Sequence, residues 1–101
     1  MLALNFSNAQ TISFTDANLK QKLIESDVTN QIAKNLSGNF FRIDANGDNE
    51  IQVAEANQVG YLDVNNASIS SLDGISNFTN LTELRCYDNQ LSGMVFNGLQ
   101  N

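Results

Sequence analysis

The sequence predicts an α/β protein in which a helical N-terminal cap precedes a short solenoid of repeats with a small parallel sheet. Three observations lead to this fold class. Apolar residues recur at helical spacing in the first part of the chain, up to Gly60. The run DANGDNEIQVAE, residues 44–55, spaces oxygen-bearing side chains regularly, and a repeated pattern begins at Tyr61. We therefore expect residues 10–60 to form the cap and residues 61–101 to form about two repeats.

Composition excludes several classes of function. The 101 residues suit one modest domain. A net charge of -6 with only five basic residues argues against binding to nucleic acids or anionic membranes, because both need clustered Lys and Arg. The chain has no His, which excludes imidazole catalysis, and Cys86 is alone, which excludes an internal disulfide. No apolar run approaches the roughly 20 residues of a membrane-spanning helix.

The N-terminal stretch MLALNFSNAQ contains a short apolar segment followed by small residues at Ser7 and Ala9. This spacing is typical of the positions before a signal-peptidase cut. We expect residues 1–9 to be the remnant of a secretory signal cleaved after Ala9, which predicts a secreted or cell-surface protein. The alternative is an ordinary disordered N-terminus.

The cap begins with an extended segment and a helix. Residues 11–14 alternate polar and apolar side chains, as a short extended segment does. Thr15 and Asp16 are good N-cap residues for a helix with one apolar face, made by Leu19, Leu23 and Ile24.

Two further helices are predicted. The first follows Asn30 and ends at Gly38, with Ile32, Ala33 and Leu36 on one face. The second follows the loop of residues 44–55, ends at Gly60, and carries Val53, Ala56 and Val59 at a spacing of three.

From Tyr61 onward the chain repeats itself with a period of 22 residues, so that Leu62 recurs as Leu84. The second copy, LTELRCYDNQL, fits the leucine-rich repeat pattern LxxLxCxxNxL, in which Cys86 is a small inward-facing hydrophobe. The first copy has Ala67 where the second has Asn89, an Asn that normally satisfies backbone groups of the turn. We expect Asn66 or Ser68 to replace it. The apolar pairs are Leu62 and Leu84, Val64 and Cys86, Ile69 and Leu91, and Leu72 and Met94.

Parallel stacking of these copies brings residues 22 apart next to each other on the exposed face of the sheet. We predict that this face binds a partner, and that Asp63 forms a cross-strand ion pair with Arg85. The alternative is a solvated face without a ligand. The predicted neighbours are Tyr61 and Glu83, Asp63 and Arg85, and Asn65 and Tyr87.

The loop of residues 44–55 matches the EF-hand pattern D-x-[DN]-x-[DN]-G-x-I-x-x-x-E, which predicts one Ca²⁺ site. Calcium takes six to eight oxygen ligands, and a tight loop turns alternate side chains inward. The predicted ligands are the side chains of Asp44, Asn46 and Asp48, the carbonyl of Glu50, Gln52 directly or through water, and both carboxylate oxygens of Glu55.

Asn49 occupies the sixth loop position, where Gly is usual because the backbone needs a positive φ. Asn is the least unfavourable substitute, so we expect the site to survive with weakened affinity. Two alternatives are an Asn-rich turn that merely caps the following helix and a catalytic pair formed by Glu50 and Glu55.

Residues 10–99 resemble the start of secreted bacterial leucine-rich repeat proteins of the internalin-like or surface-adhesin type. The segments NLTELRCYDNQL and ISSLDGISNFTNL are similar to that family's repeat and inter-repeat segment. The family often carries an EF-hand-like loop in a helical cap. The resemblance implies binding or adhesion at the cell surface, a protein or surface glycan as ligand, and no enzyme activity.

An alternative function is a dockerin-like or regulatory calcium module attached to a secreted hydrolase. The family has many repeats, so we also expect the chain to be part of a longer protein. Its last repeat would then leave Leu84, Leu91, Met94 and Phe96 on an open apolar end, so that the isolated chain self-associates or frays at its C-terminus.

Overall fold

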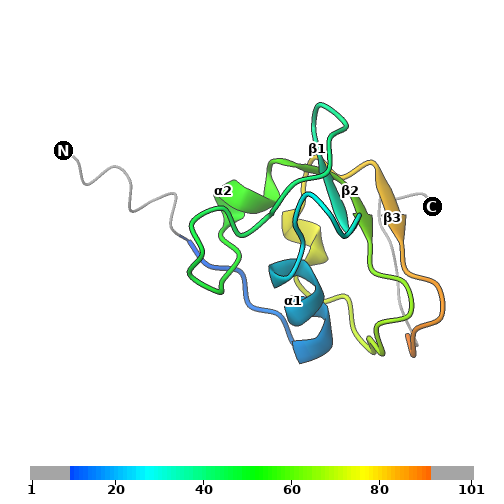
Figure 1. Ribbon diagram of the computed structural model, residues 1–101. Helices are drawn as coiled ribbons and strands as arrows, with labels where there is room; N and C mark the ends of the chain where they lie inside the picture. The colour runs from blue at the N-terminus through cyan, green and yellow to red at the C-terminus, as the bar shows by residue number, and fades with distance from the viewer. Residues whose placement is uncertain (1–9, 92–101) are drawn as a thin grey trace.

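A computed structural model of the protein describes residues 10–91 (Figure 1). In this part of the chain two α-helices, a short 3₁₀-helix and three β-strands alternate along the sequence. They are α1 (Ala17–Ile24), β1 (Ala33–Asn35), α2 (Val53–Ala56), β2 (Val59–Asp63), η2 (Ile75–Asn77) and β3 (Glu83–Arg85).

The three strands form one mixed sheet in the order β1-β2-β3. β1 runs antiparallel to β2 and pairs Lys34 with Tyr61, whereas β3 runs parallel to β2. The β2–β3 register places Tyr61 beside Glu83 and Asp63 beside Arg85. This confirms the neighbours predicted from the 22-residue period at these two positions.

The predicted fold class is nevertheless wrong, because no solenoid of repeats is evident in residues 10–91. The two copies of the repeat contribute a single parallel strand pair, and the other edge of β2 is occupied by β1 from the N-terminal half. The result is a small α/β unit with two α-helices and a three-stranded mixed sheet.

The helix predicted after Asn30 is also wrong, since residues 33–35 form β1. The backbone of Lys34 pairs with Tyr61 on one side and forms a bridge with Phe40 on the other, so the chain turns back on itself as a hairpin. Leu36, which the helix would have buried, is 56% exposed. Residues 33–35 form backbone hydrogen bonds with the edge of β2, which a helix could not do. This pairing between distant segments outweighs the local preference for a helix.

The first predicted helix is confirmed as α1. Asp16 caps it, accepting hydrogen bonds from the backbone N–H groups of Asn18 (2.8 Å) and Leu19 (3.2 Å). The other oxygen of Asp16 accepts hydrogen bonds from the backbone N–H groups of Ser70 and Ser71, at 2.6 and 3.2 Å. One carboxylate therefore starts the helix and ties it to a loop 54 residues later in the chain.

The last predicted helix is shorter than expected. α2 ends at Ala56, and Val59 already belongs to β2. The side chain of Val59 is fully buried, as the helical pattern predicts, but Val59 belongs to a strand and not to the helix.

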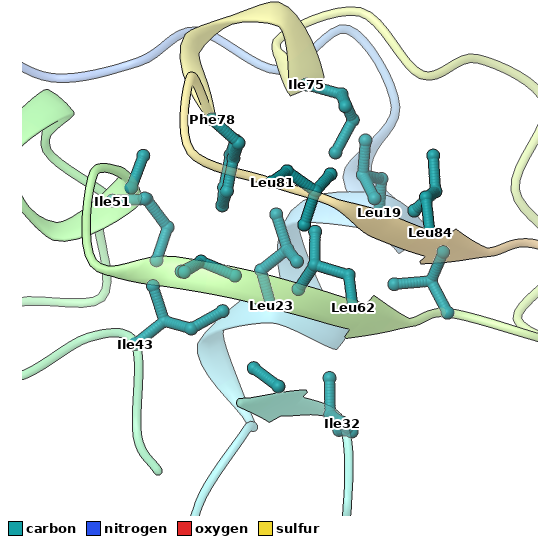
Figure 2. Close-up of a cluster of buried hydrophobic side chains, with 14 of the residues drawn as sticks. Leu19, Leu23, Ile32, Ile43, Ile51, Leu62, Ile75, Phe78, Leu81 and Leu84 are labelled. Carbon is teal, nitrogen blue, oxygen red and sulfur yellow. The ribbon is translucent and has the colours of Figure 1, made fainter. Parts of the chain in front are cut away.

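One hydrophobic core joins all these elements. Leu19 and Leu23 of α1 lie with Leu62 of β2 and Leu84 of β3 in the same cluster (Figure 2). Each of these four side chains is 0% exposed. Residues before and after Gly60 thus share one interior.

The predicted open apolar end is not seen at Leu84, which is fully buried, and Leu91 packs partly buried against the core. Met94 and Phe96 lie outside the described residues, as do residues 1–9 with the predicted cleavage site. No helix in residues 10–91 is long and apolar enough to cross a membrane.

Candidate metal centre

Three carboxylates of the predicted ion loop converge in the structure. Asp44, Asp48 and Glu55 each offer an oxygen, and these oxygens all lie within 4.8 Å of one another. Asp44 and Asp48 come from the loop, whereas Glu55 is carried by α2. Loop positions 1, 5 and 12 are thereby brought together, as the EF-hand spacing predicts.

Asp44, the first residue of the loop, is 0% exposed. Its carboxylate accepts hydrogen bonds from the backbone N–H groups of Asp48 (3.3 Å) and Asn49 (3.0 Å). Arg42 is the one cationic side chain paired with it among the described residues, at 3.9 Å, and the guanidinium side chain is 54% exposed. Such a distant, solvated partner balances a buried negative charge only in part.

Glu55 faces the loop from α2. Its carboxylate accepts hydrogen bonds from the backbone N–H groups of Gln52 (3.0 Å) and Asn46 (3.4 Å). Burial raises the pKa of Glu55, and the nearby charges of Asp44 and Asp48 raise it further. Repulsion between like charges of this kind is relieved by a proton or by a bound cation.

Asp48 differs from Glu55 in its ionisation. Burial raises the pKa of Asp48, but hydrogen bonds from the backbone N–H of Glu50 and the side chain of Gln52 outweigh it, so the pKa lies below its ordinary value. The carboxylate of Asp48 therefore stays charged at neutral pH.

Two amide side chains complete the cluster. Asn46 donates to the side-chain oxygen of Gln52 at 3.3 Å, and Gln52 donates to the carboxylate of Asp48 at 2.9 Å. Gln52 is 6% exposed. The amide oxygen of Gln52 accepts the hydrogen bond from Asn46, and that of Asn46 accepts one from the backbone N–H of Asp48 at 3.2 Å. Amide oxygens are ligands of the type that calcium accepts.

Glu50, the remaining predicted ligand, turns its side chain toward α1. Its carboxylate forms an ion pair with the ammonium group of Lys20 at 2.8 Å. The predicted ligand atom of Glu50 is its backbone carbonyl oxygen, so this ion pair leaves that role untouched.

The backbone of the loop has the predicted bend. Asn49 has a φ of 63°, which confirms the expected left-handed conformation at the sixth position. Gly47 has a φ of 71° and forms a second left-handed turn that the pattern had not singled out.

The donor set fits a hard cation. It consists of carboxylate and amide oxygens, with no nitrogen or sulfur ligand. Two oxygens that bind one Ca²⁺ at about 2.3–2.6 Å cannot lie more than about 5 Å apart. The 4.8 Å limit on the three carboxylate oxygens is therefore compatible with a single shared ion.

The predicted partner-binding face lies on the exposed side of the sheet. The predicted ion pair between Asp63 and Arg85 is wrong, because Arg85 pairs with Glu83 at 2.9 Å. Glu83 and Arg85 are two residues apart on one strand, so they share a face and reach each other without crossing to β2. Asp63 instead accepts a hydrogen bond from the backbone N–H of Asn65 at 3.1 Å.

Two residues of this face were missed from the sequence. The ammonium group of Lys34 lies over the rings of both Phe40 (5.1 Å) and Tyr61 (4.9 Å). The two rings meet edge to face, with centroids 6.4 Å apart. Lys34 lies in the segment predicted as a helix, and Phe40 lies beyond the expected end of that helix at Gly38, so no pattern placed them beside Tyr61.

Farther along the face, the side-chain oxygen of Asn65 accepts a hydrogen bond from the backbone N–H of Tyr87. The prediction that these two residues are neighbours is therefore confirmed. Tyr87 is 55% exposed, which makes it one of the most exposed large apolar side chains among the described residues.

The first turn of the repeat is satisfied by Asn89 and not by the predicted Asn66 or Ser68. The side-chain oxygen of Asn89 accepts hydrogen bonds from the backbone N–H groups of Ala67 (2.9 Å) and Ile69 (3.0 Å). Its amide group donates to the carbonyl of Val64 at 2.9 Å. The second copy thus supplies the Asn that the first copy lacks.

Cys86 is partly buried against the core, and burial raises the pKa of its thiol. Among the described residues no cationic group opposes this rise, although such a neighbour is what makes a thiol reactive. The environment agrees with the packing role predicted for Cys86.

No family model, curated protein or solved structure matches the chain. The resemblance to secreted bacterial leucine-rich repeat proteins stays a prediction.

Proposed function

We propose that the protein is a calcium-binding module in which the loop of residues 44–55 holds one Ca²⁺ that stabilises the fold. The observation that carries the proposal is the convergence of Asp44, Asp48 and Glu55, whose oxygens lie within 4.8 Å of one another around a fully buried carboxylate. Without a cation, that arrangement places two further negative charges, from the exposed Asp48 and the half-buried Glu55, next to the buried carboxylate of Asp44.

The residues that would hold the ion are Asp44, Asp48 and Glu55 through carboxylate oxygens, Asn46 and Gln52 through amide oxygens, and Glu50 through its carbonyl. The ion would supply positive charge and crosslink the loop to α2, which carries Glu55. The role is structural, and no catalytic group is proposed.

Calcium fits this set better than magnesium. Magnesium demands a near-ideal octahedron at about 2.0–2.1 Å and retains water, whereas calcium tolerates an irregular cage of side-chain and backbone oxygens. The left-handed Asn49 weakens the site, and we expect a Kd on the order of 10 μM to 1 mM. That range suits the extracellular space, which agrees with the secreted location expected for the chain.

Titration calorimetry with CaCl₂ tests the proposal. Wild-type protein stripped with chelator should bind one Ca²⁺, and Glu55→Gln should bind it at least tenfold more weakly because a charged ligand is lost. Glu25→Gln is the matched control, since Glu25 lies at the end of α1 and pairs with Lys22 instead. Absence of binding by the wild type, or equal binding by Glu55→Gln, would refute the calcium site and would mean that the loop only caps α2.

A second candidate function is binding of a protein partner by the exposed face of the sheet. The specific observation is the row of Tyr61, Arg85 and the 55% exposed Tyr87, because Tyr and Arg dominate the energetics of protein interfaces. Selection of a random peptide library on the immobilised protein tests it. Enriched peptides should lose binding to Tyr87→Ala and keep it for Val28→Ala, a 69% exposed side chain outside the sheet.

A further inference from the structure

The ion loop is paired, by backbone hydrogen bonds, with the N-terminal segment of the chain. The N–H of Ile12 donates to the carbonyl of Ile51 at 2.9 Å, and the N–H of Val53 donates to the carbonyl of Gln10 at 2.8 Å. These bonds flank an antiparallel bridge between Thr11 and Gln52. The eighth to tenth loop positions therefore lie against residues 10–12.

Gln52 connects this bridge to the candidate ligands. Its backbone forms the bridge with Thr11, while its N–H donates to Glu55 at 3.0 Å and its side-chain amide donates to Asp48 at 2.9 Å. A movement of Gln52 away from Thr11 would therefore also disturb its hydrogen bonds with Asp48 and Glu55. The same residue thus belongs to the strand pairing and to the cluster of oxygens.

α2 depends on the same pairing. Val53 is its first residue, and the N–H at that position has no partner within a helix. The carbonyl of Gln10 supplies the missing acceptor. Residues 10–12 therefore support the start of the helix whose third residue is the candidate ligand Glu55.

The segment reaches the core through the side chain of Ile12. Ile12 is 5% exposed and packs in the core beside Ile51, which points into the same interior as Phe78 (Figure 2). Gln10 and Thr11 are exposed. The pairing of Thr11 with Gln52 is an isolated bridge outside the three-stranded sheet, and such a short pairing opens at lower cost than the sheet does.

We propose that residues 10–12 are a clasp whose closure is coupled to cation binding in the loop: the ion tightens the clasp, and the closed clasp raises affinity for the ion. This inference rests on the proposed calcium site. By thermodynamic linkage the two effects have the same magnitude, because each site changes the equilibrium of the other by one shared factor.

Amide hydrogen exchange of the wild type, with calcium near a hundredfold excess over Kd and then with chelator, tests the first half. Protection of the Ile12 and Val53 amides should rise about tenfold or more with calcium. The control amide is Gly38, which donates to Asn35 at 3.0 Å in the hairpin after β1, outside the loop of residues 44–55. Its protection should stay within about twofold.

Calorimetry on a matched pair of variants tests the second half. Ile12→Ala should raise the Kd for Ca²⁺ about fivefold or more, whereas Ile75→Ala should leave it within about twofold. Both side chains are buried to a similar extent, at 5% and 4% exposed, but Ile75 lies in η2. Equal Kd values for Ile12→Ala and the wild type would overturn the clasp. Should Ile12→Ala fail to fold, the exchange measurement on the wild type decides alone.

The outcomes separate the two proposals. If calorimetry detects no calcium binding to the wild type, the proposed function is wrong, and so is the clasp, which depends on it. If calcium binds while the Ile12 and Val53 amides keep the same protection, or change only as much as Gly38 does, the clasp is wrong and the calcium site stands.

Discussion

Glu55→Gln should change the stability of the protein in opposite directions with and without calcium. The substitution keeps the size of the side chain and one oxygen that accepts a hydrogen bond from Gln52, and it removes one negative charge from the cluster. In the cation-free protein that charge is unfavourable, since burial and the charges of Asp44 and Asp48 raise the pKa of Glu55. With calcium bound, the same charged carboxylate is a ligand of the ion, so its charge stabilises the folded protein.

The size of the effect follows from linkage. At a free calcium concentration a hundred times Kd, binding to the folded state alone stabilises it by about 2.7 kcal/mol. For a domain of this size that raises Tm by roughly 10–20 °C. Glu55→Gln should lose most of this increase, while in chelator its Tm should equal or exceed that of the wild type.

The pH dependence in chelator has a defined sign. Because the folded-state pKa of Glu55 is raised, its stabilising contribution is complete below the pKa of the unfolded chain and is lost as pH rises through the folded pKa. The advantage of Glu55→Gln over the wild type should therefore appear at neutral pH and disappear in acid.

Thermal unfolding followed by circular dichroism, in calcium and in chelator, measures both effects. Glu25→Gln serves as control, since the Glu25 side chain is 46% exposed and its carboxylate lies 3.8 Å from the ammonium group of Lys22, outside the loop. Identical wild-type curves in the two buffers would refute the calcium site. A Glu55→Gln protein that is less stable than the wild type in chelator would refute the reasoning about charge repulsion.

Three further predictions concern residues around the site and the sheet. Asn49→Gly should raise the free energy of unfolding, measured in urea, by up to about 1 kcal/mol and tighten calcium binding, because φ is 63° at this position. Asn89→Ala should cost about 2–4 kcal/mol in the same assay, since it leaves the N–H groups of Ala67 and Ile69 and the carbonyl of Val64 unpaired; a loss below about 1 kcal/mol would contradict the role of this side chain. A double-mutant cycle of Glu83→Gln with Arg85→Gln should show a favourable coupling that fades with salt, whereas Asp63→Asn with Arg85→Gln should show none.

The parts of the structure predicted correctly from the sequence are governed by contacts between near neighbours or by a strict period. Asp16 caps α1 because its carboxylate reaches the N–H groups two and three residues later. Asn49 takes a positive φ because the twelve-residue loop pattern requires a turn there. The parallel register of Tyr61 and Glu83 follows from equal spacing of the apolar residues in two copies of one pattern.

The same holds for the candidate site. The spacing within residues 44–55 is enough to predict that Asp44, Asp48 and Glu55 lie together, because all three belong to one loop and the helix that follows it. The partner of the loop could not be predicted in this way. Residues 10–12 are separated from it by about 40 positions, and no local pattern shows that they form a bridge with Gln52.

Tertiary structure alone decided which segment would occupy the free edge of β2. Residues 33–35 have a helical pattern, yet they form β1 because the hydrogen bonds offered by that edge outweigh local preference. Because β1 pairs with β2, the protein has a mixed sheet and not the expected solenoid, and Lys34 lies over Tyr61. The choice of Glu83 over Asp63 as partner of Arg85, and of Asn89 as the group that satisfies Ala67, likewise depends on distances between side chains that periodicity does not specify. Sequence patterns determine conformation and register where the interacting groups are local or periodic, whereas contacts between distant segments are determined only when those segments compete for the same edge and the same core.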